Sequence, residues 1–234
     1  MQRWNVRTPI FTIPSKRDDD AGNPAITGEV ATMTRLLLIR HAQTDANGHS
    51  LAGRLPGVGL NDLGRRQARA LAARLGQLSI AAIYASPLER AMQTAEAIAT
   101  LRGHRIVPCE ELLEIDYGEW TGLSLQALAD DEAFRIFNGQ RSCAAARAGE
   151  YMLQAQARMV VGLDRLRRLH PQQTIAVVSH GDMIRAAVAH YAGIPLDLFH
   201  RIEISPASLS VVDVDDMWIR IVCINDTGSA GDFA

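Results

Sequence analysis

The feature of this sequence that most limits its fold is the stretch LLLIRHAQTDAN at residues 36–47. Four apolar residues lead without a spacer into Arg40 and His41, and small polar residues follow. An uninterrupted apolar run of this length is typical of a strand that is buried on both faces of a sheet. Placing two basic side chains at the end of such a strand is costly unless an anion or a reaction uses them. We therefore expect the rest of the chain to supply partners for this pair.

Strand and helix signals alternate along most of the chain. The predicted strands are residues 35–39, 80–85, 105–108, 174–178, 209–213 and 218–224. The predicted helices begin near residues 61–64 and at residues 88, 149 and 181, and Ser86 is expected to cap the second of them. Strands separated by helices indicate a parallel sheet that is covered on both faces. The sequence therefore predicts a three-layer α/β fold with a mostly parallel central sheet.

The two ends of the chain differ from the region between them. Residues 1–33 are polar, carry proline and glycine, and have no helix or strand period, so we expect a flexible N-terminal extension. Met33 is an alternative start of translation. Residues 34–226 are predicted to form one domain, and residues 227–234 a flexible tail.

Charge and cysteine usage exclude several classes of partner. The 24 basic and 26 acidic residues give a net charge of -2, so no basic field favours nucleic acid. No apolar run approaches the ~18 residues that a membrane helix needs, so no membrane partner is expected. Cys109, Cys143 and Cys223 lie far apart without a CxxC pair, which indicates reduced thiols and a cytoplasmic protein rather than a zinc site.

Basic residues follow three of the predicted strands at their carboxyl ends. Arg40 and His41 follow the first strand, and His180 follows the strand at residues 174–178. Arg90 lies one helical turn beyond the strand that ends at Ala85. Because ligands bind at the carboxyl ends of the strands of an open parallel sheet, we expect these four side chains to share one crevice.

Two arginines and two histidines in one crevice suit a tetrahedral dianion, and phosphate fits best. The positive charges of Arg40 and Arg90 disfavour protonation of His41, so its neutral imidazole is available as a nucleophile. Attack on phosphorus would form a phosphohistidine. The departing alkoxide then needs a proton, for which a partly buried carboxylic acid is the obvious donor.

Several ordered motifs extend this pattern to nearly the whole chain, and together they resemble a known family. The motifs are RHAQT at 40–44, Asn47, Gly53-Arg54, LGRRQA at 63–68, SPLERAMQTA at 86–95, EIDYGEWTG at 114–122 and SHG at 179–181. With these motifs the chain resembles branch 1 of the histidine phosphatase superfamily, the phosphoglycerate mutase-like family, from Arg35 to about Asn225.

The resemblance implies roles for individual residues and implies that neither a metal nor an organic cofactor is needed. It implies that His41 is the phosphorylated nucleophile and that Glu114 is the proton donor. It also implies that the phosphate pocket is formed by Arg40, Arg90 and His180. Asn47 would contact the transferring phosphoryl group, and Arg54 would contact the rest of the substrate. Glu110, Glu111 and Asp116 compete with Glu114 as the acid, and only the spacing to the Gly-Glu-Trp motif selects Glu114.

One residue departs from the family pattern. Most members have glycine directly after the nucleophile, whereas this chain has Ala42. If the position required a positive φ or a very close backbone approach, alanine would cost about 1 kcal/mol or distort the loop.

We therefore expect a metal-independent phosphomonoesterase that acts on a small phosphorylated metabolite. A cofactor-dependent phosphoglycerate mutase is the alternative enzyme, although the segment at residues 122–149 is shorter than the insertion that seals such mutases against water. A phosphate-binding or regulatory protein with weak turnover is the non-enzymatic alternative, motivated by Ala42. A homodimer also stays open, with either of the last two strands as its pairing edge.

Overall fold

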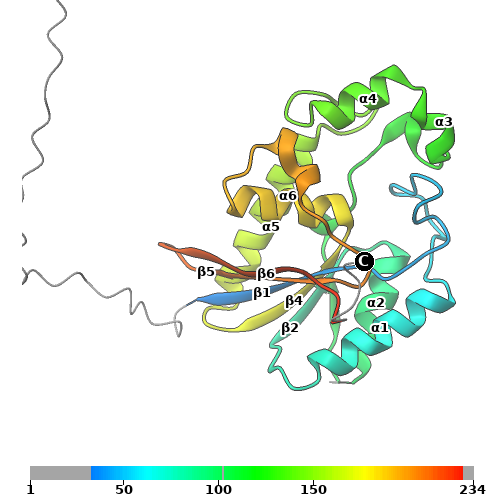
Figure 1. The fold of residues 1–234 in the computed structure, drawn as a ribbon. Coiled ribbons are helices and arrows are strands. Elements are labelled where there is room, and N and C mark those ends of the chain that lie inside the picture. The colour runs from blue at the N-terminus through cyan, green and yellow to red at the C-terminus, as the bar shows by residue number, and fades with distance from the viewer. Residues whose placement is uncertain (1–32, 102, 229–234) are drawn as a thin grey trace, which may run out of the picture. The chain divides into compact units, whose positions relative to one another are not determined.

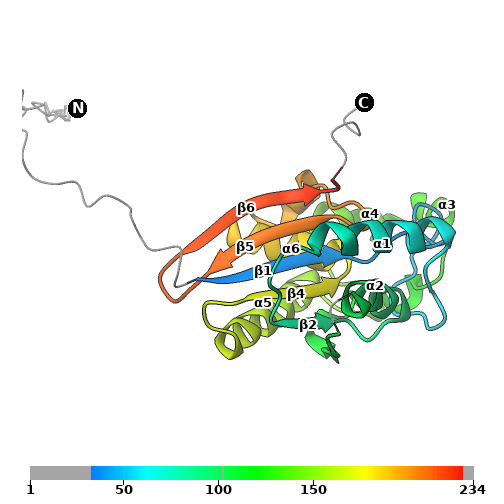
Figure 2. The same cartoon turned by 90° about the horizontal axis from the view of Figure 1, so that it is seen from below.

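The computed structural model describes residues 33–101 and 103–228. Its centre is a six-stranded sheet in the order β3-β2-β4-β1-β5-β6. Figures 1 and 2 show the strands from two directions. The strands are β1 (Thr34–Arg40), β2 (Ala82–Ala85), β3 (Ile106–Pro108), β4 (Thr174–Ser179), β5 (Leu209–Val214) and β6 (Ile219–Asp226).

The sheet is parallel at its centre and antiparallel at one side. β1 pairs in parallel with β4, and β2 pairs in parallel with both β4 and β3. β5 runs antiparallel to β1 on one side and to β6 on the other. The predicted mostly parallel sheet is confirmed. β5 lies inside the sheet, however, so residues 209–213 cannot form the pairing edge considered for a homodimer, whereas β6 lies at an edge.

Helices cover both faces of this sheet, which confirms the predicted three-layer architecture (Figure 1). α1 (Asp62–Leu75) and α2 (Glu89–Thr100) pack on one face, and α5 (Met152–Leu169) and α6 (Gly181–Tyr191) pack on the other. Side chains of β1 alternate between the two cores, as a strand requires: Leu37 and Ile39 face the first pair of helices, and Leu36 and Leu38 face the second.

Shorter elements lie beyond the carboxyl ends of the central strands. They are the 3₁₀ helices η2 (Glu110–Leu112), η3 (Gly118–Trp120) and η4 (Leu196–Arg201), and the α-helices α3 (Leu125–Ala129) and α4 (Glu132–Gly139). The α3–α4 segment extends away from the sheet in Figure 1, on the side where β1 and β4 end. This is the side where the sequence predicts the crevice.

The starts of the first two helices differ in how well the sequence predicted them. The Asn61 side chain accepts a hydrogen bond from Gly64 N at 2.9 Å and caps α1, as expected. The expectation that Ser86 caps the next helix is wrong, because α2 begins at Glu89 and its N-cap, Leu88, makes no side-chain hydrogen bond. The Ser86 hydroxyl is instead 2.8 Å from His180 Nε2.

Most of the predicted N-terminal extension and C-terminal tail, residues 1–32 and 229–234, lies outside the described residues. Those domain limits stay predictions. Among the helices of the described residues, none combines the length and the apolar character required to cross a membrane.

Candidate active site

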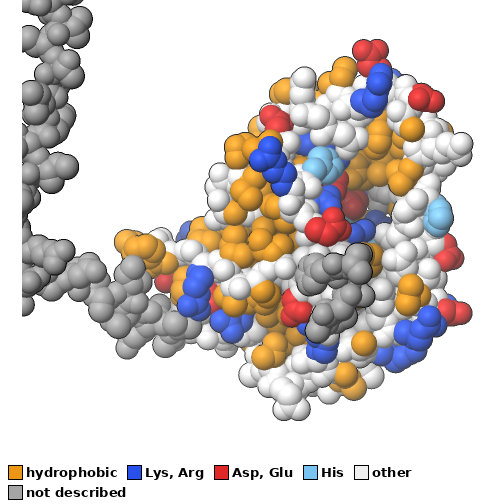
Figure 3. All heavy atoms as spheres, viewed as in Figure 1, with side chains coloured by type: hydrophobic (Ala, Val, Ile, Leu, Met, Phe, Trp, Pro, Cys, Tyr) orange, Lys and Arg blue, Asp and Glu red, His pale blue; other side chains and the backbone are white. Residues whose placement is uncertain are grey.

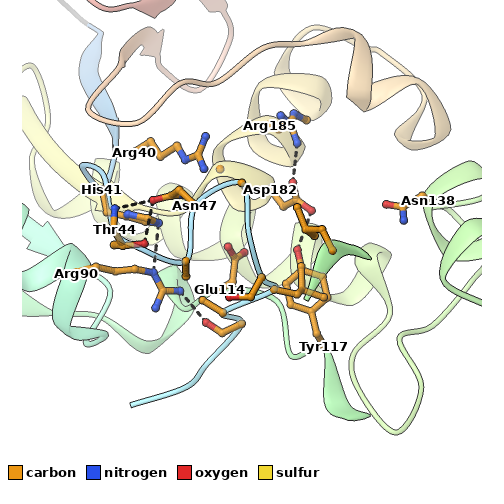
Figure 4. A pocket seen from close by; sticks show the side chains of 18 of the residues that line it. Arg40, His41, Thr44, Asn47, Arg90, Glu114, Tyr117, Asn138, Asp182 and Arg185 are labelled. Atoms are coloured by element: carbon orange, nitrogen blue, oxygen red, sulfur yellow. Dashed lines mark hydrogen bonds and ion pairs between the residues drawn. The ribbon is translucent and has the colours of Figure 1, made fainter. Parts of the chain in front are cut away.

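A pocket of about 240 Å³ lies where β1 and β4 end. It is a hollow on the face shown in Figure 3, with charged side chains in its depth. Five of the seven predicted site residues line it, namely Arg40, His41, Asn47, Arg90 and Glu114 (Figure 4). His180 is fully buried beside the pocket, with its ring centroid 5.2 Å from that of His41. Arg54 is not part of the pocket wall.

The backbone around His41 selects which of its ring nitrogens can react. His41 Nδ1 lies 2.8 Å from the carbonyl oxygen of Ala42. A carbonyl oxygen can only accept a hydrogen bond, so Nδ1 must carry the proton and donate. Nε2 therefore keeps its lone pair in the neutral ring. Among the described residues, the hydrogen-bond partner of that lone pair is Arg90 Nε, at the long distance of 3.3 Å.

The surroundings of His41 keep its ring neutral. Burial lowers its pKa well below 6.5, and the positive charges of Arg90 and Arg40 lower it further. The hydrogen bond to Ala42 opposes this shift without cancelling it. At neutral pH the side chain is therefore a neutral imidazole, with its proton on Nδ1 and its lone pair on Nε2.

Three buried donors around His41 have no hydrogen-bond partner within the described part of the chain: Arg40 Nε, Arg90 Nη1 and His180 Nδ1. Buried polar groups in folded proteins are almost always paired, so three unpaired donors beside one another indicate a site for an anion. Another nitrogen of each arginine is anchored to a main-chain carbonyl. Arg40 Nη1 donates to Ile204 O at 2.5 Å, and Arg90 Nη2 donates to Gly53 O at 2.7 Å.

Ser86 explains how His180 becomes a donor towards this site. The Ser86 hydroxyl is 2.8 Å from His180 Nε2, and it receives a longer contact from Leu88 N at 3.4 Å. Burial lowers the pKa of His180 well below 6.5, so the ring is neutral. When the hydroxyl donates to Nε2, the ring proton lies on Nδ1, which is the nitrogen without a partner.

Ala42 does not strain the loop that follows the nucleophile. Its φ is not among the positive values of the described residues. Its backbone N donates to Thr94 Oγ1 at 3.0 Å, and its side chain is fully buried in the core on the α1–α2 face. Ala42 therefore does not need the positive φ that would make alanine costly. The reason for considering a phosphate-binding protein with weak turnover is thereby removed.

Glu114 is the acid that the fold brings to the pocket. Its carboxyl group points into the space between Arg40, Arg90 and Asp182 in Figure 4. Burial raises the pKa of Glu114 to about 7, and the negative charge of Asp182 adds to the effect, while Arg90 and Arg40 oppose it. A carboxyl group with this pKa is partly protonated at neutral pH and can donate a proton.

The three competing carboxylates are used elsewhere or face away. Glu111 pairs with Arg165 at 2.9 Å, and Asp116 accepts a hydrogen bond from Gly118 N at 2.9 Å. Glu110 is exposed. None of the three lines the pocket, so the geometry agrees with the choice made from the motif spacing.

Asn47 and Arg54 lie in different surroundings. Asn47 Oδ1 accepts hydrogen bonds from Thr44 N at 2.8 Å and Thr44 Oγ1 at 3.0 Å, which closes the loop after His41 and keeps Asn47 on the pocket wall. Arg54 Nε donates to the main-chain carbonyl of Glu114 at 2.8 Å, and its Nη2 pairs with Glu150 at 3.1 Å. Arg54 therefore contacts the main chain of the acid, and its expected contact with the rest of the substrate stays a prediction.

Sequence reasoning missed a group of polar residues around Asp182 that also line the pocket. Asp182 Oδ2 accepts hydrogen bonds from Tyr117 Oη at 2.9 Å and Arg141 Nη1 at 3.1 Å, and Asp182 Oδ1 accepts one from Arg185 at 2.6 Å. Burial alone would raise the pKa of Asp182, but Arg141 and Arg185 hold it below its usual value. Its position two residues after His180, at the same strand end, is the signal that could have identified it. Arg141 lies in a segment without a recognisable pattern.

Comparison with known proteins agrees with this geometry. Phosphoserine phosphatase 1 of Hydrogenobacter thermophilus is 30% identical over 206 residues, covering 86% of this chain and 96% of that protein. A metal-independent phosphoserine phosphatase of Arabidopsis thaliana is 33% identical over 162 residues, covering 66% of this chain and 67% of that protein. A mycobacterial glucosyl-3-phosphoglycerate phosphatase matches in structure with a TM-score of 0.74 and 27% identity, covering 83% of this chain and 99% of that protein.

The family itself follows from the extent of the match. Residues 36–227 match the family model described as histidine phosphatase superfamily (branch 1). The matched region includes every strand and α-helix of the described fold except the first two residues of β1. This chain belongs to branch 1 of the histidine phosphatase superfamily and is a phosphatase of that superfamily.

Proposed function

We propose that this phosphatase hydrolyses small phosphomonoesters, without a metal ion, through a phosphohistidine on His41. The Nε2 lone pair of His41 attacks phosphorus, and the bond from phosphorus to the ester oxygen breaks. Glu114 gives its proton to that oxygen, so the alcohol leaves neutral. A water molecule then attacks the phosphohistidine and gives a proton to the Glu114 carboxylate. This step releases phosphate and restores His41.

The observation that carries the proposal is that the His41 Nε2 lone pair, which accepts only a long hydrogen bond from Arg90, lies beside unpaired donors. The Ala42 carbonyl holds the His41 proton on Nδ1, and three buried nitrogens beside the ring lack partners within the described residues. Donors in this arrangement stabilise the charge on the equatorial oxygens of a phosphoryl group in transit. A site for binding phosphate alone would not need a histidine with a lone pair directed in this way.

The substrate class is proposed from the size of the pocket and from relatives. A cavity of about 240 Å³ holds a small metabolite rather than a macromolecular segment. Relatives are named for phosphoserine and glucosyl-3-phosphoglycerate, so both compounds belong in a first substrate panel. Asn47 is proposed to contact the transferring phosphoryl group. Arg54 is proposed to contact the rest of the substrate, while its Nε also donates to the main-chain carbonyl of Glu114.

Release of phosphate from wild type and His41→Gln tests the reaction. We expect wild type to release phosphate from an aryl phosphate and His41→Gln to lose essentially all turnover while keeping its fold. Quenching wild type during turnover with alkaline detergent should trap a phosphoryl group that survives in base, is lost in acid and is absent from the variant. Equal rates in the two proteins would refute His41 as the nucleophile.

The mutase alternative is tested with 3-phosphoglycerate and its bisphosphate. Free phosphate without isomerisation is the result we expect, because a phosphohistidine that water reaches is hydrolysed. Interconversion of the phosphoglycerates without release of phosphate would support the mutase instead.

We also propose a cytoplasmic location and leave the oligomeric state as a prediction. Cys109, Cys143 and Cys223 are free thiols, as expected for a reducing compartment. A homodimer would have to pair through β6 or another surface, since β5 is internal. Sedimentation equilibrium of the full chain distinguishes a monomer from a dimer.

A further inference from the structure

The segment that carries Glu114 has no regular secondary structure of its own. Residues 113–117, named here the acid loop, connect η2 to η3. Main-chain carbonyl groups in such a loop need partners from elsewhere in the protein. The identity of those partners decides how firmly the Glu114 side chain is held against the leaving group.

One arginine of α5 supplies the partners of two successive carbonyl groups in this loop. Arg158 Nη1 donates to Leu113 O at 2.7 Å, and Arg158 Nη2 donates to Glu114 O at 3.0 Å. The same Nη1 also donates to Glu111 O at 2.9 Å, just before the loop. The planar guanidinium therefore fixes three successive parts of the backbone that leads to the acid.

Glu150 orients this arginine and holds the far end of the acid loop. Its carboxylate accepts hydrogen bonds from Arg158 Nε at 2.8 Å and Arg158 Nη2 at 3.0 Å, which is a bidentate pair. The carboxylate also accepts one from Asp116 N at 3.2 Å, and Glu150 N donates to Asp116 O at 2.8 Å. Arg54 adds a second donor to Glu114 O and a third cationic contact to Glu150.

These hydrogen bonds hold the main chain before and after Glu114. Neither Arg158 nor Glu150 lines the pocket itself. Both residues are mostly buried, with 22% and 15% of their side chains exposed, so their pair is weakly screened by solvent. We propose that Arg158 and Glu150 are positioning residues that aim the Glu114 carboxyl at the leaving-group oxygen. The inference rests on the proposed role of Glu114 as proton donor.

The leaving group provides a readout that loss of stability alone would not change. An alkyl phosphate must be protonated as it leaves, whereas p-nitrophenolate leaves without a proton. The value of kcat/KM covers only the steps up to loss of the alcohol. The ratio of kcat/KM for p-nitrophenyl phosphate to that for glycerol 2-phosphate therefore measures how well the acid works.

We expect Glu114→Gln to raise this ratio strongly, and Arg158→Gln to raise it roughly tenfold to a hundredfold, the loss expected when a reacting group is slightly misplaced. Arg165→Gln is the matched control. Arg165 lies on the same helix and pairs with Glu111, but it makes no contact with the main chain of the acid loop. Its ratio should stay at the wild-type value.

Two further variants keep the test decisive if Arg158→Gln does not fold. Arg158→Lys keeps the charge without the planar fork, and Glu150→Gln removes the charge that orients Arg158; each should raise the ratio less. A rise for Glu114→Gln with none for the foldable Arg158 and Glu150 variants would overturn the positioning role alone. An unchanged ratio for Glu114→Gln itself would instead overturn the proposed proton donor.

Discussion

At the scale of single residues, the site depends on two groups that have opposite protonation states at neutral pH. Burial and two nearby arginines keep His41 neutral, although an exposed histidine would titrate near this range. Burial and Asp182 keep a proton available on Glu114, although an exposed glutamate would be ionised. One low-dielectric pocket therefore prepares both a nucleophile and an acid, because burial disfavours the charged form of each.

The pH dependence of kcat/KM for an alkyl phosphate should follow from these shifts. Glu114 must be protonated to act, so activity should fall as pH rises through about 7. Protonation of His41 should limit the rate only well below pH 6.5. Asp182→Asn removes a negative charge that raises the pKa of Glu114, so its falling limb should move to lower pH.

The variant and wild type are compared on the same substrate. Ionisation of the phosphate ester, whose second pKa lies near 6, therefore affects both pH profiles equally. Asp164→Asn, which removes a carboxylate that pairs with Arg167 and Arg168 on α5, is the control and should leave the profile in place. An Asp182→Asn profile that coincides with that of wild type would contradict the electrostatic role of Asp182.

At the scale of elements, the acid loop is placed by close packing where η3 begins. Gly118 has a φ of 53°, in the left-handed region that glycine adopts without strain. A Cβ at this position would lie 2.1 Å from the carbonyl oxygen of Arg147. The loop and the segment before α5 can approach this closely only because the residue is glycine. The position of Glu114 therefore depends on a neighbouring residue that has no side chain.

Gly118→Ala should destabilise the protein by more than the roughly 1–2 kcal/mol that the left-handed conformation costs alanine. The added clash is with backbone, which cannot rotate away. Gly193→Ala is the matched control, because Gly193 has a φ of 66° and no atom within 4 Å of its ideal Cβ. Urea unfolding measures both changes, and equal losses for the two variants would show that the close approach is unimportant.

At the scale of the whole molecule, the sheet gathers two arginine charges and a neutral histidine donor from distant parts of the chain at one edge. Arg40 is the last residue of β1, Arg90 lies in the first turn of α2 beyond β2, and His180 follows β4. These strands are neighbours and run parallel, so their carboxyl ends meet. The phosphoryl group thereby receives the positive surroundings that a divalent cation supplies in many other phosphatases.

Phosphate release should accordingly be unchanged by EDTA and should not rise on addition of Mg²⁺. Within residues 33–101 and 103–228, no group of three or more His, Cys, Asp and Glu side chains is arranged to hold a metal ion. The assay compares initial rates on p-nitrophenyl phosphate before and after prolonged chelation. A loss of activity that Mg²⁺ or Zn²⁺ restores would contradict the proposed mechanism.

The sequence by itself determined the central strands, the layer order and the residues that meet at the sheet edge. Apolar runs and helical spacing are local patterns, and parallel pairing then places Arg40, His41 and His180 together. The sequence was less informative where hydrogen-bond partners are far apart in the chain and are connected by loops. The tertiary structure alone decided that Ser86 orients His180 instead of capping a helix, and that Arg54 contacts Glu114.

The tertiary structure also decided the chemistry of the acid. The pKa of Glu114 depends on its burial and on its nearness to Asp182, and its position depends on contacts from Arg158 and Glu150. None of these quantities is a property of neighbouring residues in the chain. Each follows from distances that exist only after α5, α6 and the acid loop have packed together, because desolvation and Coulomb energies depend on spatial separation rather than on sequence separation.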